Sequence, residues 1–345
     1  MNKFLIILIL YCATAAFSLP VMGQTQSDKP VYFWGKTDQY YMRQAEQTLA
    51  LIDSSLLEYL PVEGAPAPRK LALFALDGIL HDTRYDNSDP LRKFFSRRTA
   101  QLINDLTQPV KKNKAKTFKA YNDGFITKTP SVTLAFDLIR GSCKGQQLTS
   151  NEDMLKIIEQ CDALFITHNH GDHADPWVAD QFIKAGKPVV ATPDIFPTNK
   201  SVMHLRDEKT TDQTLQLANG QKVRMQILPG HQDDMLCNLY VITTPEGFTT
   251  AHIGDQYNKD DLEWIPEIHK RIPGIDVLTM NCWAMNIPAV VGGFSPRIVI
   301  TGHENELDHS VDHREAYWLT FKKMANCKKP YVVMTWGENY EIQAN

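Results

Sequence analysis

One nine-residue segment, Thr167–Asp175, constrains this chain more than any other feature. It places four ligand-type side chains within six positions, at His168, His170, Asp172 and His173. Imidazole and carboxylate are ligands that zinc and similar ions prefer, and a step of two residues in an extended loop puts two side chains on one side. Because Asp172 and His173 then project towards a second position, the spacing indicates two metal ions. A solvated histidine-rich loop is the alternative, but an apolar strand directly before the segment favours a metal site.

After residue 110 the sequence alternates short β-rich runs with amphipathic helices. Helices are expected at 151–160 and 176–185, and a hairpin turn at 218–220. Strands are expected at 117–121, 124–127, 132–136, 163–167, 189–191, 223–228, 239–243, 248–253, 277–280, 298–301 and 331–334. Two batches of strands with helices between them predict an α/β sandwich rather than a single parallel sheet. The 345 residues, 43% of them hydrophobic, suffice for such a core and exclude a disordered chain or a small disulfide scaffold.

The preceding residues, 24–110, have a different character and predict a small helical region. Apolar residues recur there at steps of three and four, and Pro61 ends the first helix. The expected helices are 37–60, 68–79 and 88–107. The basic run Lys111–Lys116 is typical of a solvated linker, so we place a boundary before a second domain, 111–345.

The N-terminus is typical of an export signal. Met1–Lys3 precede an apolar run, Phe4–Phe17, that is shorter than the roughly 20 residues of a membrane-spanning helix. Cleavage is expected after Gly23, with Ala15 as the alternative, and residues 1–23 are then removed. The five cysteines beyond this segment contain no CxxC pair, which excludes a disulfide framework and leaves one bridge open. The chain is therefore expected to be exported, with the bacterial periplasm as its compartment.

The HxHxDH spacing of residues 168–173 resembles the signature of the metallo-β-lactamase superfamily. That family carries a later histidine, a bridging aspartate and a last histidine at strand ends, and His231, Asp255 and His303 stand at such ends beside glycines. The resemblance covers about residues 115–336 and implies a four-layer αββα sandwich. It also implies one ion held by His168, His170 and His231, a second held by Asp172, His173 and His303, and Asp255 between them.

Several positions distinguish the chain within that superfamily. Residue 170 is histidine rather than the glutamate of the related di-iron oxygen reductases, and Asp255 stands where one group of true β-lactamases has cysteine. Leu307 excludes the HExxH motif of zincins. The run Gly302–Leu307 is most similar to the group that contains ascorbate-6-phosphate lactonase and the N-acyl-phosphatidylethanolamine phospholipases D.

The other histidines receive less specific interpretations. His252 is expected to be a buried core or supporting residue. His309 and His313 are four residues apart beside charged neighbours, which favours a solvated or supporting face. Asn281 and Trp283 follow an expected strand near the edge of the site, where contact with substrate or burial in the core are both open.

Together these features predict a binuclear metal-dependent hydrolase. The expected cofactors are two divalent ions, zinc first and manganese or iron as alternatives, which hold a hydroxide for attack on an ester, lactone or phosphodiester. Asp172 is the expected catalytic residue, because it can orient that hydroxide or accept its proton. A lipid phosphodiesterase approached across the helical region, a β-lactam hydrolase and a non-catalytic metal-binding protein remain alternatives. With 36 basic and 40 acidic residues the net charge is −4, so the expected partner is a small-molecule or lipid substrate and no nucleic acid.

Overall fold

The structure is a computed structural model that describes residues 36–206 and 211–343. The expected signal peptide, residues 1–23, lies outside the described residues. The chain divides into two compact units, Met1–Tyr40 and Tyr41–Asn345. The described part of the first unit contains the beginning of helix α1 (Thr37–Glu58), and everything below concerns the second unit.

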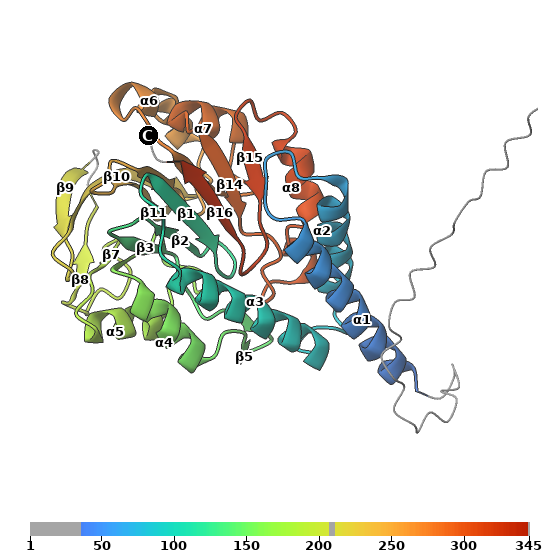
Figure 1. The fold of residues 1–345 in the computed structure, drawn as a ribbon. Coiled ribbons are helices and arrows are strands. Elements are labelled where there is room, and N and C mark those ends of the chain that lie inside the picture. The colour runs from blue at the N-terminus through green and yellow to red at the C-terminus, as the bar shows by residue number, and fades with distance from the viewer. Residues whose placement is uncertain (1–35, 207–210, 344–345) are drawn as a thin grey trace, which may run out of the picture. The chain divides into compact units, whose positions relative to one another are not determined.

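Two seven-stranded sheets form the centre of this unit (Figure 1). The first sheet consists, in spatial order, of β16 (Asn339–Gln343), β1 (Lys114–Lys119), β2 (Phe125–Lys128), β3 (Thr133–Phe136), β6 (Ala163–Phe165), β7 (Val189–Ala191) and β8 (Val202–His204). The second consists of β15 (Tyr331–Val333), β14 (Ile298–Gly302), β13 (Val277–Asn281), β12 (Thr249–His252), β11 (Met235–Thr243), β10 (Lys222–Gln232) and β9 (Thr211–Gln216). Each sheet is antiparallel at one end, whereas β3, β6, β7 and β8, and likewise β12, β13, β14 and β15, run parallel. A separate short hairpin pairs β4 (Ser142–Cys143) with β5 (Gln146–Gln147).

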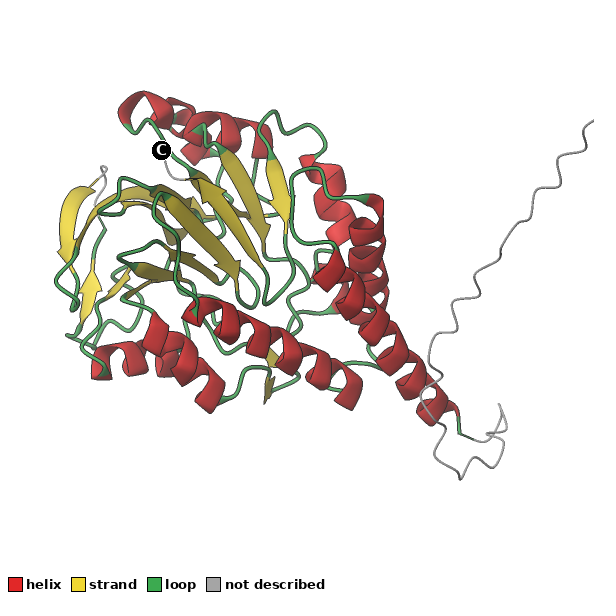
Figure 2. Cartoon of the chain, in the orientation of Figure 1, coloured by secondary structure: helices red, strands yellow, loops and turns green. Residues whose placement is uncertain are grey.

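Helices cover the outer face of each sheet (Figure 2). They are α2 (Ala67–Leu80), α3 (Asp89–Thr107), α4 (Asn151–Gln160), α5 (Pro176–Lys184), α6 (Ile268–Arg271), α7 (Ile287–Phe294) and α8 (Tyr317–Met324), with short 3-10 turns at Asp260–Glu263, Ile265–Glu267 and Val311–His313. The sheets meet through side chains such as Phe136 and Phe165 against Met225 and Tyr240. The α3, α4 and α5 helices pack on the first sheet, and α6 and α7 on the second. The four-layer αββα sandwich predicted from the sequence is thus confirmed.

The α1, α2 and α3 helices share a core with the ends of the sandwich. Leu49, Leu76 and Phe95 pack in one buried cluster with Tyr121 and Trp336. Beside this cluster the buried Arg69 and Arg98 both pair with Glu338, which lies just before β16. Burying three charged groups is tolerated only when they pair, so this network ties the helices to the C-terminal residues.

The predicted helices and hairpin are present, with small shifts at their ends. The prediction of a solvated linker at 111–116 is wrong, because β1 begins at Lys114. Lys114 pairs with Glu341 of β16 while Ala115 and Thr117 are fully buried, so the lysines occupy the outward positions of a strand. The sequence pattern also missed α7, whose residues are almost all apolar and so show no amphipathic period.

Within the described residues, no helix has both the length and the apolar character needed to cross a membrane. The five described cysteines are all free, four of them buried.

Candidate metal centre

The candidate site lies where strands of both sheets end. β6 ends at Phe165, and the chain runs directly into the histidine-rich loop that closes at Asp175, the N-cap residue of α5. In the second sheet, β12 ends three residues before Asp255 and β14 ends immediately before His303. Because neighbouring parallel strands end at the same edge of a sheet, these side chains are brought together.

Six of the seven predicted ligands meet at this edge. They form two triplets whose nitrogen and oxygen atoms lie within 4.8 Å of one another, His168/His170/Asp255 and Asp172/His173/His303. Asp255 Oδ2 lies 3.2 Å from His173 Nε2 and 3.4 Å from His303 Nε2. His303 Nε2 is also 3.2 Å from Asp172 Oδ2. Asp255 therefore lies between the two triplets.

Asp137 holds two of the histidines in place through hydrogen bonds. This buried carboxylate was not predicted as part of the site. It follows β3, and its Oδ2 accepts hydrogen bonds from His173 Nδ1 at 2.8 Å, His252 Nε2 at 3.0 Å and Thr167 Oγ1 at 2.6 Å. Its Oδ1 accepts the backbone N–H of Thr167 at 2.8 Å. This arrangement sets the orientation of His173 and explains why His252, as expected, is a buried supporting residue.

Burial and opposite charges shift the ionisation of the cluster. Burial lowers the pKa of His168 to about 3, so its ring is neutral and keeps a lone pair for a ligand bond. Burial would also lower the pKa of His303, but Asp255 and Asp172 outweigh it and raise that pKa to about 9. For Asp172 burial acts in the opposite direction, yet the neighbouring His173 and His303 hold its pKa well below the ordinary value. The buried side chains of this cluster therefore have strongly shifted pKa values, which is typical of functional sites.

The donor set fits divalent metal ions. Because His173 Nδ1 is engaged with Asp137, its Nε2 faces Asp172 and Asp255. Within the described part of the chain this buried ring nitrogen has no hydrogen-bond partner. Imidazole nitrogens and carboxylate oxygens suit zinc, manganese and iron alike. The cluster therefore supports a metal site and leaves the metal open.

His231 is the predicted ligand that the structure does not bring into the cluster. Among the described residues, it belongs to none of the groups whose ligand atoms lie within 4.8 Å of one another. Its Nε2 instead receives a hydrogen bond from the Arg206 guanidinium at 2.8 Å, and its Nδ1 is 3.0 Å from Asp261 Oδ1. The Arg206 guanidinium thus occupies the lone pair that an ion would need, and the role of His231 as a ligand stays a prediction.

The glycines beside the predicted ligands serve two purposes. Gly254, before Asp255, has a positive φ of 50° and allows the sharp turn expected from the sequence. Gly302, before His303, is needed for space, because a Cβ atom there would stand 1.9 Å from Asp123 Oδ1.

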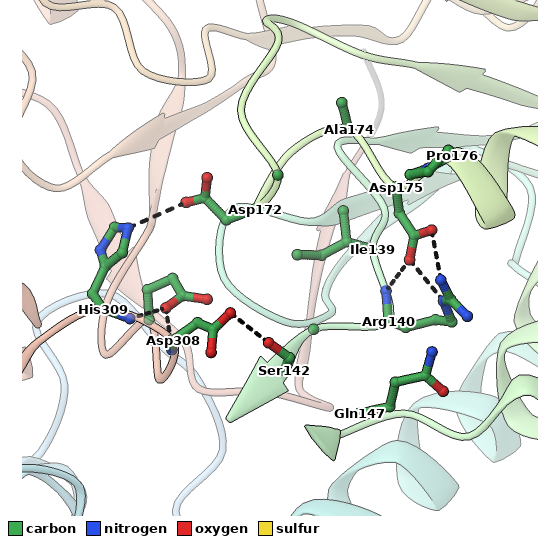
Figure 3. Close-up of a pocket in the computed structure, with 13 residues that line it drawn as sticks. Ile139, Arg140, Ser142, Gln147, Asp172, Ala174, Asp175, Pro176, Asp308 and His309 are labelled. Carbon is green, nitrogen blue, oxygen red and sulfur yellow. Dashed lines mark hydrogen bonds and ion pairs between the residues drawn. The ribbon is translucent and has the colours of Figure 1, made fainter. Parts of the chain in front are cut away.

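A cavity of about 450 Å³ opens beside Asp172 (Figure 3). Two polar pairs stand in its wall, Arg140 with Asp175 and Ser142 with Asp308. Arg140 binds Asp175 through Nε and Nη2 and Asn151 through Nη1, so all three of its nitrogens are engaged. The remaining lining residues are Ile139, Gly141, Gln147, Gly171, Ala174, Pro176, Glu306 and His309.

Residues predicted near the edge of the site surround the cluster. His309 Nε2 is 4.0 Å from Asp172 Oδ2 and its ring lies 5.8 Å from that of His303, so this histidine stands at the cavity rather than only on a solvated face. The Trp283 ring is partly exposed and packs edge-on against His303, with ring centroids 5.4 Å apart. Asn281 Nδ2 lies 3.5 Å from Asp255 Oδ1.

Comparisons with known proteins identify the fold. No protein-family model matches the chain, and no curated protein does. Among solved structures, Igni18, a metallo hydrolase from the archaeon Ignicoccus hospitalis, is similar with a TM-score of 0.51 and 19% identity over 67% of this chain and 100% of that one. A protein from Veillonella parvula described as a possible metal-dependent hydrolase is similar with a TM-score of 0.50 and 15% identity, covering 65% of this chain and 98% of that one. At these identities the likeness shows a shared fold.

Proposed function

We propose that the chain is a binuclear metal-dependent hydrolase of the metallo-β-lactamase superfamily. The observation that carries the proposal is the pair of adjacent ligand triplets with Asp255 between them. The Nε2 of His173, which has no hydrogen-bond partner among the described residues, points towards Asp255. A purely structural site would not need two ions or a cavity at its side. The two similar solved proteins are themselves described as metal-dependent or metallo hydrolases, which agrees with this proposal.

The residues present would hold two ions, one at each triplet. When bound, such ions supply a water that is activated at neutral pH and a Lewis acid for a carbonyl or phosphoryl oxygen. Asp172 stands between the cluster and the cavity, and its Oδ2 accepts a hydrogen bond from Asn122 Nδ2 at 3.1 Å. We assign it the task of orienting the attacking water. His309, 4.0 Å from the same oxygen, is placed to donate a proton to the leaving group.

The walls of the cavity favour a neutral substrate. The Arg140 guanidinium in the lining is already paired with Asp175, so these two charges offset each other, and Glu306 and Asp308 add negative charge. The negative charge of a phosphodiester would be offset mainly by the metal ions. An uncharged ester or lactone meets no repulsion from these carboxylates. We therefore rank esters and lactones above phosphodiesters.

The test is a substrate panel on zinc-reconstituted protein, comparing wild type with the double variant Asp172→Ala/His303→Ala. The panel contains esters, lactones, phosphodiesters, a β-lactam and vesicles of N-acyl-phosphatidylethanolamine. Wild type should hydrolyse at least one ester or lactone, and the double variant should lose that turnover while its circular dichroism spectrum is retained. Full activity in the double variant would contradict the assignment. Bound metal without hydrolysis of any substrate would favour the non-catalytic alternative, and release of phosphatidic acid from the vesicles would favour the lipid phosphodiesterase.

We also propose export to the periplasm, on the basis of residues 1–23. Expression of the full chain in a bacterial host, with fractionation and N-terminal sequencing, tests this proposal. A mature N-terminus at Gln24 or Ala16 in the periplasmic fraction is expected, and an intact Met1 in the cytoplasm would contradict it.

A further inference from the structure

A second buried carboxylate stands at the cluster without a hydrogen-bond partner among the described residues. Asp123 lies in the turn between β1 and β2, is fully buried, and neither of its side-chain oxygens has a hydrogen-bond partner among the described residues. The preceding residue, Asn122, donates its amide N–H to Asp172 and accepts the backbone N–H of His303. The turn therefore reaches the same edge of the sandwich as the predicted ligands.

Burying a carboxylate without a hydrogen-bond partner is costly. The penalty for burying one ion without compensation is several kcal/mol. The fold nevertheless makes room for this side chain, because Gly302 lacks the Cβ atom that would overlap Asp123 Oδ1. A cation that the protein chain itself does not provide would remove the penalty.

The nearest basic groups among the described residues are hydrogen bonded or paired elsewhere. The Nε2 atom of His252 is 3.8 Å from Asp123 Oδ2 but only 3.0 Å from Asp137 Oδ2, to which it is hydrogen bonded. The Lys119 ammonium, also buried at this end of β1, is paired with Glu304.

What remains beside Asp123 is the metal cluster. Asp123, His173 and Asp255 each place a ligand atom within 4.8 Å of the others, and all three are buried. The Nε2 of His173, like the Asp123 carboxylate, has no hydrogen-bond partner among the described residues. With metal–ligand bonds of about 2.0–2.2 Å, ligand atoms on one ion stand roughly 3–4 Å apart, so small shifts suffice for a common ion.

We propose that Asp123 is an additional ligand of the ion held by His173 and Asp255, a carboxylate outside the seven predicted positions. The inference rests on the proposed function in so far as it requires the cluster to bind metal. Charge supports it, since two divalent cations carry four positive charges. The carboxylates Asp137, Asp172 and Asp255 supply three negative charges, and Asp123 supplies the fourth.

The test compares zinc binding by full-length wild type, Asp123→Asn and Asp123→Ser. Asp276→Asn is the matched control, because Asp276 is equally buried but accepts hydrogen bonds from Thr249 and Arg297 at the opposite end of β12. Zinc per chain is measured by mass spectrometry after dialysis against a series of chelator-buffered zinc concentrations. Thermal unfolding of each protein is recorded with and without zinc.

Wild type and the control should bind two zinc ions, whereas Asp123→Asn and Asp123→Ser should bind one of the two at least about tenfold more weakly. The zinc-free Asp123→Asn protein should unfold at a higher temperature than zinc-free wild type, because the uncompensated carboxylate is gone, and zinc should stabilise it less. Equal zinc affinity and an equal zinc-induced shift in both Asp123 variants and wild type would overturn the inference while leaving the metal centre intact. Wild type that binds no zinc would instead overturn the proposed function.

Discussion

Replacement of Asp137 by asparagine tests how far metal binding by the cluster depends on the hydrogen bonds that Asp137 accepts. Asp137 has a positive φ of 43°, a conformation that asparagine tolerates better than most residues, so the substitution isolates the loss of charge and of one acceptor. The carboxylate accepts four hydrogen bonds, three of them on Oδ2. An asparagine can keep the three on Oδ2 by turning its NH₂ group towards the Thr167 N–H, which then loses its partner.

The magnitude follows from this count. One buried N–H without a partner costs about 1–3 kcal/mol. The three remaining hydrogen bonds also become weaker, because their acceptor is no longer an ionised carboxylate. We therefore expect Asp137→Asn to lower the free energy of unfolding by about 3–5 kcal/mol. Because His173 loses its fixed orientation, zinc affinity should fall by about 10–100-fold.

The assay is urea unfolding of the zinc-free protein together with chelator competition for zinc. Glu338→Ala is the matched control, since it removes the carboxylate partner of the buried Arg69, while Arg98 keeps its pair with Asp53. It should destabilise the protein by a similar amount, about 3–5 kcal/mol, without touching the cluster. Unchanged zinc affinity in Asp137→Asn, or an equal loss of zinc affinity in Glu338→Ala, would show that Asp137 does not position His173 for metal binding.

Two further substitutions probe the edges of the cluster. Arg206→Ala should free His231 Nε2 and raise the affinity for the more weakly bound zinc ion by about tenfold, or about 1.4 kcal/mol, as measured by isothermal titration calorimetry. An unchanged titration would show that Arg206 does not compete with metal. Gly302→Ala should destabilise the protein by about 1–3 kcal/mol in urea unfolding and also weaken zinc binding, since the new Cβ displaces Asp123; wild-type stability would contradict the tight contact.

Much of the site is predictable from the sequence because its ligands are repeated in a short loop or follow apolar strands. The segment 168–173 begins three residues after the end of β6, and His303 directly follows β14. Polar residues after apolar strands mark these positions, and the resemblance to the superfamily singles out His303 as a ligand. Periodicity likewise predicts α1 to α5, whose buried faces recur at helical spacing.

The remaining features depend on pairing across the fold. Asp123 and Asp137 are single aspartates after strands, and only the spatial neighbours of each one distinguish them from residues of ordinary turns. Arg206 meets His231 from a segment 25 residues away, which no local pattern reveals. The pairing of β16 with β1 joins residues more than 200 positions apart, so the lysines of β1 resemble a linker until their partners are known.

The central claim is that the strand-end cluster holds two metal ions. Anomalous diffraction at the zinc absorption edge, from crystals of zinc-loaded wild type, tests it most directly. Two zinc peaks are expected, one at His168, His170 and Asp255 and one at Asp172, His173 and His303. Zinc-loaded crystals without an anomalous peak at this cluster would contradict it.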